Sequence, residues 1–185
     1  MKPEQIVEAT LFASQTPLTA AEIARADDEL TTAAVDEAIT RLRETYESEE
    51  RAFQIYELGD GFQILTRPEY ASYLERFDSV PRSPFLSGAA LETLAIVAYR
   101  QPIGRIEIEE VRGVGASSVL RTLTDWELVE VVGRGEGLGR PLLYGTTRTF
   151  LEHFGLRDLD ELPSPDELPV VLSGLQVDEA RDEES

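Results

Sequence analysis

FQIYEL at residues 53–58 and FQILTR at residues 62–67 flank Gly59, Asp60 and Gly61. Apolar and polar residues alternate along both runs, as they do in a strand with one buried face. An Asp-Gly pair between two such runs is the strongest short-range signal of a β-hairpin, because its residues accept the positive φ angles of a tight turn. The stretch therefore predicts two antiparallel strands joined by a short turn.

Three helices are predicted before this hairpin. Apolar residues recur at helical spacing from Ile6 to Ala13, and Pro17 ends that run. Thr19 and Glu22 form a T-x-x-E capping box that opens a short second helix. An apolar stripe over residues 32–47 marks a longer third helix. Three helices followed by a hairpin is the winged-helix pattern, and a further helix with aromatic residues is expected over residues 68–77.

The same order repeats in the second half of the chain. Helices are expected over residues 87–100, 105–112 and 117–126, strands over 128–132 and 141–145, and a closing helix over 147–154. In the helix at 105–112, Ile106 and Val111 are expected to face inward. A glycine-rich wing, residues 133–140, joins the two strands. We therefore expect an α+β, mainly α, chain of two tandem winged-helix domains, each a helix-turn-helix plus a β-hairpin wing.

The domain boundaries follow from composition. We expect an N-terminal winged-helix domain over residues 1–80, a linker rich in proline and small residues over 81–86, a C-terminal winged-helix domain over 87–156, and an acidic, mostly disordered tail over 157–185. The tail contains PVVLSGL at residues 169–175. This stretch is either a short docking motif or part of a solubilising tail.

The residue inventory excludes most catalytic chemistry. The chain has 185 residues with no Cys and one His, so thiolate nucleophiles, Cys-ligated metals and multi-His metal centres are excluded. His153 has no Ser, Asp or Cys arrangement that would form a triad, and the wing GRGEGLGR fits neither phosphate-binding glycine motif. We expect no enzyme activity, no catalytic residues, no cofactor and no metal.

The acidic residues are unevenly distributed. The 36 Asp and Glu outnumber the 17 Lys and Arg, for a net charge of −19. Residues 81–156, however, hold nine acidic and eight basic residues, so any surface that tolerates anionic partners is expected there. Acid excess with a single lysine indicates either adaptation to a high-salt cytoplasm or a nucleotide bias toward arginine codons. The start of the chain lacks the basic and apolar pattern of a signal peptide, and we expect a cytoplasmic protein.

DNA binding is the alternative function. Winged helices most often read DNA by placing the third helix in the major groove. In the second copy the candidate residues are Ser117, Ser118, Arg121 and Thr122 with Arg134 and Arg140 of the wing. Phosphate-driven binding needs several basic residues in one patch, and neither copy supplies them without including acids. A DNA-binding transcriptional regulator therefore stays the second interpretation.

One stretch resembles a known family. IVAYRQPIGRIEIEEVRGVGASSVLRTL at residues 96–123, with ELVEVVGRGEGLGRPLLYGTT at residues 127–147, is similar to segregation and condensation protein B, the accessory subunit of the bacterial and archaeal SMC–kleisin complex. The similarity is dense over residues 87–156 and looser over residues 3–78. AYRQPI, VLRTL and GRPLLYGTT are its most specific blocks.

The resemblance implies a non-enzymatic protein that forms a homodimer, mainly through its N-terminal domain, and binds a kleisin subunit (ScpA-like). Through kleisin it would join the SMC ATPase and support chromosome condensation and segregation at the nucleoid. It implies DNA contact only indirectly or weakly, and no membrane contact.

Candidate contact residues come from the family-like blocks, which mix the aromatic and arginine residues enriched at interface hot spots. For the partner they are Tyr99, Arg100, Arg112, Arg121, Arg140, Pro141 and Tyr144. The alternative for the two tyrosines and the proline is that they fill the domain core. For the dimer the candidates are Ile6, Leu11, Phe12, Tyr70, Tyr73 and Phe77.

Overall fold

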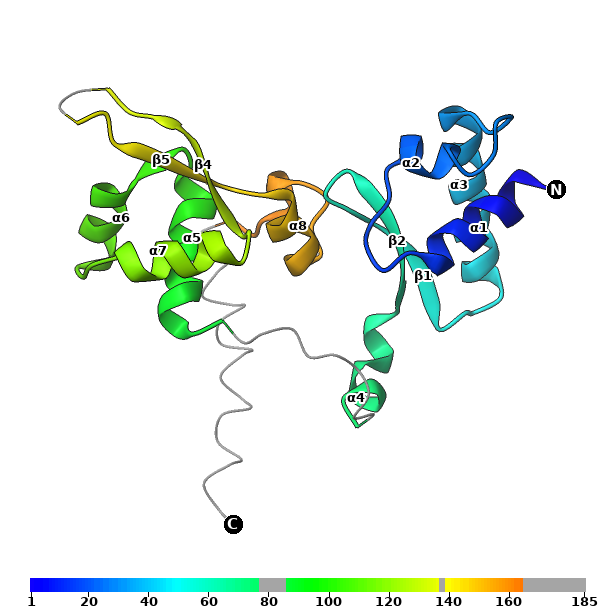
Figure 1. Ribbon diagram of the computed structural model, residues 1–185. Helices are drawn as coiled ribbons and strands as arrows, with labels where there is room; N and C mark the ends of the chain where they lie inside the picture. Colours follow the sequence, from blue (N-terminus) through cyan, green and yellow to red (C-terminus); the bar gives the residue numbers. More distant parts are fainter. Residues whose placement is uncertain (77–85, 137–138, 165–185) are drawn as a thin grey trace, which may run out of the picture.

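The computed structural model describes residues 1–76, 86–136 and 139–164 of the chain. Two separate hydrophobic cores form within them, one from residues between Val7 and Ile55 and one from residues between Leu86 and Phe150. We call the parts built on these cores the first unit and the second unit. Figure 1 shows the two units side by side, each made mainly of helices around a small sheet.

The first unit contains the predicted three helices and hairpin. They are α1 (Pro3–Ala13), α2 (Ala20–Ala24), α3 (Thr32–Ser48), β1 (Phe53–Leu58) and β2 (Gly61–Thr66). The strands are antiparallel, with Ile55 opposite Ile64. Gly59 and Asp60 form the turn, with φ angles of 49° and 66°. The hairpin prediction is confirmed.

Local sequence signals explain where these helices begin. Thr19 Oγ1 accepts the backbone N–H of Glu22 at 3.2 Å, and Glu22 Oε2 accepts the N–H of Thr19 at 2.8 Å. This reciprocal pair is the predicted capping box, and it satisfies two N–H groups that the start of α2 would otherwise leave unpaired. The Thr31 side chain caps α3 with a single bond, which it accepts from the backbone N–H of Ala34.

The segment after the hairpin is shorter than predicted. It consists of the 3₁₀ turn η1 (Pro68–Tyr70) and the four-residue helix α4 (Ala71–Leu74). Neither carries a buried residue, so no core packing supports a longer helix here. Phe77 lies outside the described residues.

The second unit repeats the order of the first with one extra strand. Its elements are α5 (Gly88–Arg100), β3 (Ile103–Gly104), α6 (Arg105–Arg112), α7 (Ser117–Asp125), β4 (Val129–Arg134), β5 (Leu142–Thr146) and α8 (Arg148–Phe154). The sheet order is β3-β5-β4. With the first unit, this gives the expected α+β, mainly helical fold of two tandem winged helices.

One helix faces the core differently from the prediction. Ile106 and Val111 of α6 were expected to point inward, yet both are exposed, and Ile108 is the residue of α6 that is completely buried. A helix turns by about 100° per residue, so Ile106 and Ile108 point to nearly opposite sides. The prediction for Ile106 and Val111 was wrong because the side of α6 that carries Ile108 packs into the second core.

The packed chain continues beyond the predicted end of the second domain. Residues 159–161 form a 3₁₀ turn, η2 (Leu159–Glu161), and Leu162 packs against the second core. The Tyr99 hydroxyl donates a hydrogen bond to the Pro163 carbonyl at 2.6 Å. Of the residues assigned to the tail, Leu162 and Pro163 therefore contact the second unit, while PVVLSGL lies outside the described residues.

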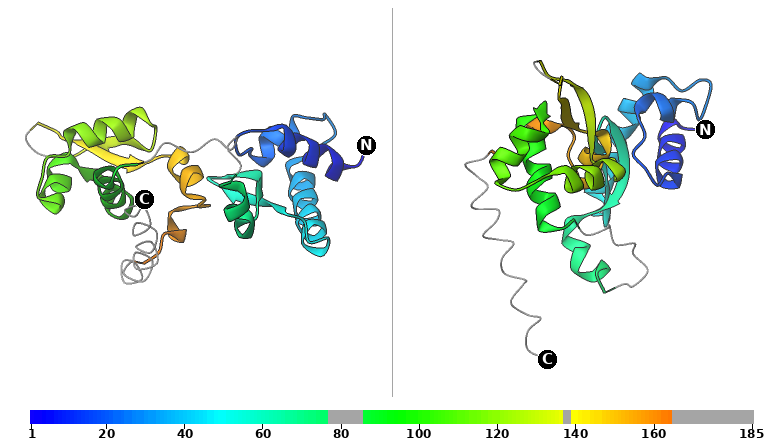
Figure 2. Two further views of the ribbon diagram at one scale, coloured as in Figure 1. Left: turned by 90° about the horizontal axis from the view of Figure 1, so that it is seen from below. Right: turned by 60° about the vertical axis from the view of Figure 1, so that its left-hand side comes forward.

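The two units meet at α8. Both views in Figure 2 place α8 next to the β1–β2 hairpin of the first unit. The backbone N–H of Gly59 donates to the carbonyl of Leu156, just after α8, at 3.1 Å. Across residues 1–76, 86–136 and 139–164, no helix has the length and apolar character that a bilayer crossing requires.

Candidate functional site

A notch opens between α6 and the wing of the second unit. Strand β3 sets its position, because Ile103 and Gly104 pair with Tyr144 and Leu143 and so hold the start of α6 beside β5. The notch has a volume of about 170 Å³ and is lined by Arg105, Ile106, Pro141, Leu142 and Tyr144.

The floor of the notch is apolar and open to solvent. Ile106 is 59% exposed, and Leu142 is also exposed, although each carries a large apolar side chain. Leu142 and Tyr144 point to the same side of β5, because alternate residues of a strand share a face. An exposed apolar floor in a concave site is suited to an apolar side chain from a partner.

Arg105 lines the notch. Two further arginines lie on the wing, Arg134 opposite Leu142 and Arg140 directly before Pro141. The Arg105 guanidinium bonds both carboxylate oxygens of Glu109 at 3.0 Å. The N–H of Ala116 and then Arg105 hold the pKa of Glu109 below its usual value, so this carboxylate stays charged. Within the described part of the chain, the side chains of Arg134 and Arg140 are exposed and make no hydrogen bond or ion pair. The notch therefore combines an apolar floor with two uncommitted positive charges on the wing.

The predicted partner residues fall into separate groups. Pro141 and Tyr144 line the notch, and Arg140 directly precedes Pro141. Arg100 is exposed at the end of α5, and Arg121 is exposed on α7. These two arginines are not part of the notch lining. The structure thus brings together three of the seven predicted residues: Arg140, Pro141 and Tyr144.

Two other predicted partner residues serve the second unit itself. The Arg112 side chain is 5% exposed, and its Nε bonds Glu92 Oε2 at 3.0 Å. A second Arg112 nitrogen bonds the Gly115 carbonyl at 3.2 Å, so this arginine closes the turn between α6 and α7. Tyr99 is half-buried and is covered by Pro163 through its hydroxyl hydrogen bond.

Sequence reasoning missed Arg105, Ile106 and Leu142. A signal for Ile106 was present, since Ile106 and Ile108 cannot both face the core of one short helix. Leu142 and Leu143 are likewise neighbours in β5, so only one of them can face the core. The strand β3, which sets the face that each residue presents, has only two residues and left no readable pattern.

The predicted dimer residues also separate by burial. Leu11 is buried in the first core, and Ile6 packs against that core. Tyr70 is half-buried. Phe12 is 82% exposed and Tyr73 is 70% exposed, so these two present the large apolar surface of the set.

The DNA-reading surface of the first unit is already engaged. Arg41 of α3 bonds Glu4 at 2.7 Å and Glu37 at 3.4 Å. Arg43 donates to the carbonyl of Ile55 and lies over the Phe62 ring, 5.7 Å from its centroid. Both arginines of this helix therefore have partners within the unit, which leaves few charges for phosphate.

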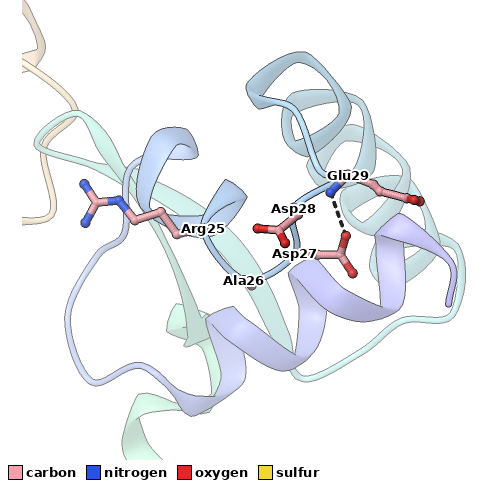
Figure 3. A pocket seen from close by; sticks show the side chains of 5 residues that line it. All are labelled: Arg25, Ala26, Asp27, Asp28 and Glu29. Carbon is pink, nitrogen blue, oxygen red and sulfur yellow. Dashed lines mark hydrogen bonds between the residues drawn. The ribbon is translucent and has the colours of Figure 1, made fainter.

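A second depression lies in the loop between α2 and α3 and is lined by Arg25, Ala26, Asp27, Asp28 and Glu29. Figure 3 shows that the three carboxylates point in different directions. Asp27 Oδ1 accepts the N–H of Glu29 at 2.9 Å, which is a local turn contact. Over the described ranges, no group of three or more His, Cys, Asp or Glu could hold a metal ion.

Comparison with known proteins gives one consistent result. The model of the family described as segregation and condensation complex subunit ScpB matches residues 5–165. Segregation and condensation protein B of Geobacillus thermodenitrificans is 51% identical over 164 residues, which covers 85% of this chain and 76% of the relative. The Brevibacillus brevis protein of the same name is 44% identical over 185 residues, covering 100% of this chain and 92% of the relative.

Two solved structures are also similar to this chain in sequence. A crystal structure of ScpB from Mycobacterium tuberculosis is 32% identical and covers 83% of this chain and 95% of that chain, with a TM-score of 0.39. A dimer of an ScpB N-terminal domain complexed with an ScpA peptide is 35% identical and covers 40% of this chain and 91% of that chain, with a TM-score of 0.37. Because the family model spans most of the sequence and close relatives share about half of its residues, the chain belongs to the ScpB family of non-enzymatic segregation and condensation complex subunits.

Proposed function

We propose that this chain acts as a dimeric ScpB subunit that binds an ScpA-type kleisin segment and thereby supports chromosome condensation and segregation by the SMC complex. The observation that carries the proposal is the family match over residues 5–165. The solved N-terminal domain dimer with an ScpA peptide, 35% identical to this chain, supports both the dimer and the partner. The protein would work in the cytoplasm, at the nucleoid.

The two units divide these tasks. Dimer contact falls to the first unit, where Phe12 and Tyr73 expose large aromatic side chains. Because the solved complex has its ScpA peptide on an N-terminal domain dimer, the first unit takes part in kleisin contact as well. We assign a second kleisin contact to the notch of the second unit. Its rim carries Arg134 and Arg140 on the wing, in the segment of the chain where acidic and basic residues nearly balance. A kleisin segment with one apolar anchor and flanking acidic residues would complement both the floor and the rim.

The notch makes the proposal testable by one substitution. Ile106→Glu places a charge on the apolar floor, and the loss of one buried aliphatic contact is worth about 1.5–3 kcal/mol. This corresponds to a roughly 10- to 100-fold weaker affinity. We expect that loss when a fluorescent fragment of the kleisin's central region from the same organism is titrated with the full chain, and we expect co-purification to fail.

Val114→Glu is the matched control. Val114 is 57% exposed, almost as much as Ile106, but it lies in the turn between α6 and α7 and does not line the notch. This variant should bind kleisin like the unmodified chain and melt at the same temperature as Ile106→Glu. Equal affinity for all three proteins would refute the notch as the kleisin site, and failure of the unmodified chain to bind any kleisin fragment would refute the function.

A further inference from the structure

The contact between the two units centres on the side chain of Arg148. This residue begins α8, and one of its terminal nitrogens, Nη2, donates a hydrogen bond to the carbonyl of Pro17 in the first unit at 3.3 Å. A second bond, from the N–H of Gly59 to the carbonyl of Leu156, lies beside it. The two bonds join the β1–β2 turn and the α1–α2 loop to the same end of the second unit (Figure 1).

Two glycines leave the space that the arginine fills. A Cβ at Gly61 would lie 2.8 Å from Arg148 Nη2 and 3.0 Å from the Pro17 Cβ. A Cβ at Gly59 would lie 3.1 Å from Arg148 Cγ and 3.5 Å from the Leu151 Cβ. Both glycines are buried. Side chains at these positions would push α8 away from the hairpin, so the absence of a Cβ allows the close approach.

A residue of the same helix, α8, orients the Arg148 side chain for this contact. Arg148 Nε bonds Glu152 Oε1 at 2.8 Å, one turn further along α8. This ion pair orients the guanidinium and leaves Nη2 to reach across to Pro17. On the other side, Glu22 of α2 carries a pKa lowered first by its bonds to Thr19 and further by the nearby charge of Arg148.

Little else holds the two units in one orientation. Within the described residues, the interactions between units run through the hairpin turn, the α1–α2 loop, α8 and the segment that follows α8. Small contacts between domains leave relative motion as the default, so a single residue can set the orientation. This orientation would matter for the proposed function, because the proposed dimer contact lies on the first unit and the notch lies on the second.

We infer that Arg148 is an interdomain positioning residue: seated against Gly59 and Gly61, it fixes the orientation of the notch-bearing unit relative to the dimerising unit. The part of this inference that concerns kleisin rests on the proposed function. The orientation itself does not, and it is measured without kleisin.

The chain contains no cysteine, so two introduced cysteines can be labelled without background. Glu44→Cys on α3 and Ser118→Cys on α7 are both exposed and lie on different units. Spin labels at these sites, with the labelled chain diluted in excess unlabelled chain, report the distance between units by pulsed EPR. We expect one narrow distance distribution for the parent, and Arg148→Ala should lose the single maximum and broaden.

Three further measurements separate positioning from general damage. Arg105→Ala removes an equivalent i,i+4 arginine–glutamate pair within α6 and should leave the distribution narrow. Arg148→Lys keeps the charge but not the forked nitrogens, and should give an intermediate width. The melting temperature of Arg148→Ala should change little, because the residue lies outside both cores. An unchanged distribution in Arg148→Ala, or equal broadening in Arg105→Ala, would overturn the inference. Neither result would count against the proposed kleisin binding.

Discussion

The two units share one fold but place their unpaired arginines differently. In the first unit, Arg41, Arg51 and Arg67 pair with glutamates of the same unit, and Arg43 bonds a backbone carbonyl. The side chains of Arg25 and Arg76 are exposed and have no partner in the described part of the chain. In the second unit, four arginines pair with acidic residues of the same unit: Arg105, Arg112, Arg121 and Arg148. The side chains of Arg100, Arg134 and Arg140 are exposed and have no partner in the described part of the chain, and the last two lie on the wing. Acidic residues outnumber basic ones 17 to 7 over residues 1–80, but only 9 to 8 over residues 81–156. The two copies therefore share the winged-helix fold but differ in net charge and in whether the wing carries unpaired arginines.

The wings of the two units also differ in length and in what they contact. The first wing has a two-residue turn that lies against α8, so it serves the contact between units. The second wing points away from the first unit (Figure 1) and exposes Val131, Val132 and Leu142. The short wing thus makes a contact within the chain, while the longer wing leaves apolar side chains exposed.

The largest effect is expected from breaking the dimer through the first unit alone. Phe12→Glu removes an exposed aromatic side chain from each protomer of a symmetric interface, so the loss of about 1.5–3 kcal/mol counts twice. We expect a monomer by light scattering at concentrations where the parent is a dimer. Val114→Glu, an equally charged change on the second unit, should stay dimeric. A dimeric Phe12→Glu chain would show that another surface of the first unit mediates assembly.

The next effect tests whether the two cores fold independently. Leu11→Ala and Ile108→Ala each empty a buried site of one core and should cost about 2–5 kcal/mol. The single tryptophan, Trp126, lies in the second unit, so its fluorescence reports that unit, whereas circular dichroism reports both. Ile108→Ala should shift the fluorescence transition.

Leu11→Ala should instead shift only the part of the dichroism transition that fluorescence does not follow. Coincident shifts of both signals in both variants would mean that the units unfold together, and that the contact at Arg148 is stronger than its two hydrogen bonds indicate.

The smallest effect concerns salt. Raising KCl from 0.1 M to 1 M shortens the screening length from about 10 Å to about 3 Å. Self-repulsion in the acidic first unit should weaken, so its transition should rise by more than the Trp126 transition of the nearly neutral second unit. Equal shifts of the two transitions would mean that the excess of acidic residues serves solubility in general. The difference in charge would then not make the stabilities of the two units respond differently to salt.

Much of this protein was readable from sequence. Residues 53–67 determined the first hairpin, Thr19 and Glu22 determined the start of α2, and the blocks at residues 96–147 identified the family. These features are local: a capping box, an Asp-Gly turn and alternating strands are specified by residues within a few positions of one another.

Tertiary structure alone decided which side chains are available to a partner. Ile106 and Ile108 are both apolar and two residues apart, and only the packing of α6 against α5 exposes the first and buries the second. Arg112 and Tyr99 fitted an interface by residue type, yet Glu92, Gly115 and Pro163 engage them within the unit. Arg148 meets Pro17 across 131 positions of sequence. No local pattern encodes such a pairing, because it depends on where the two units come to rest against each other.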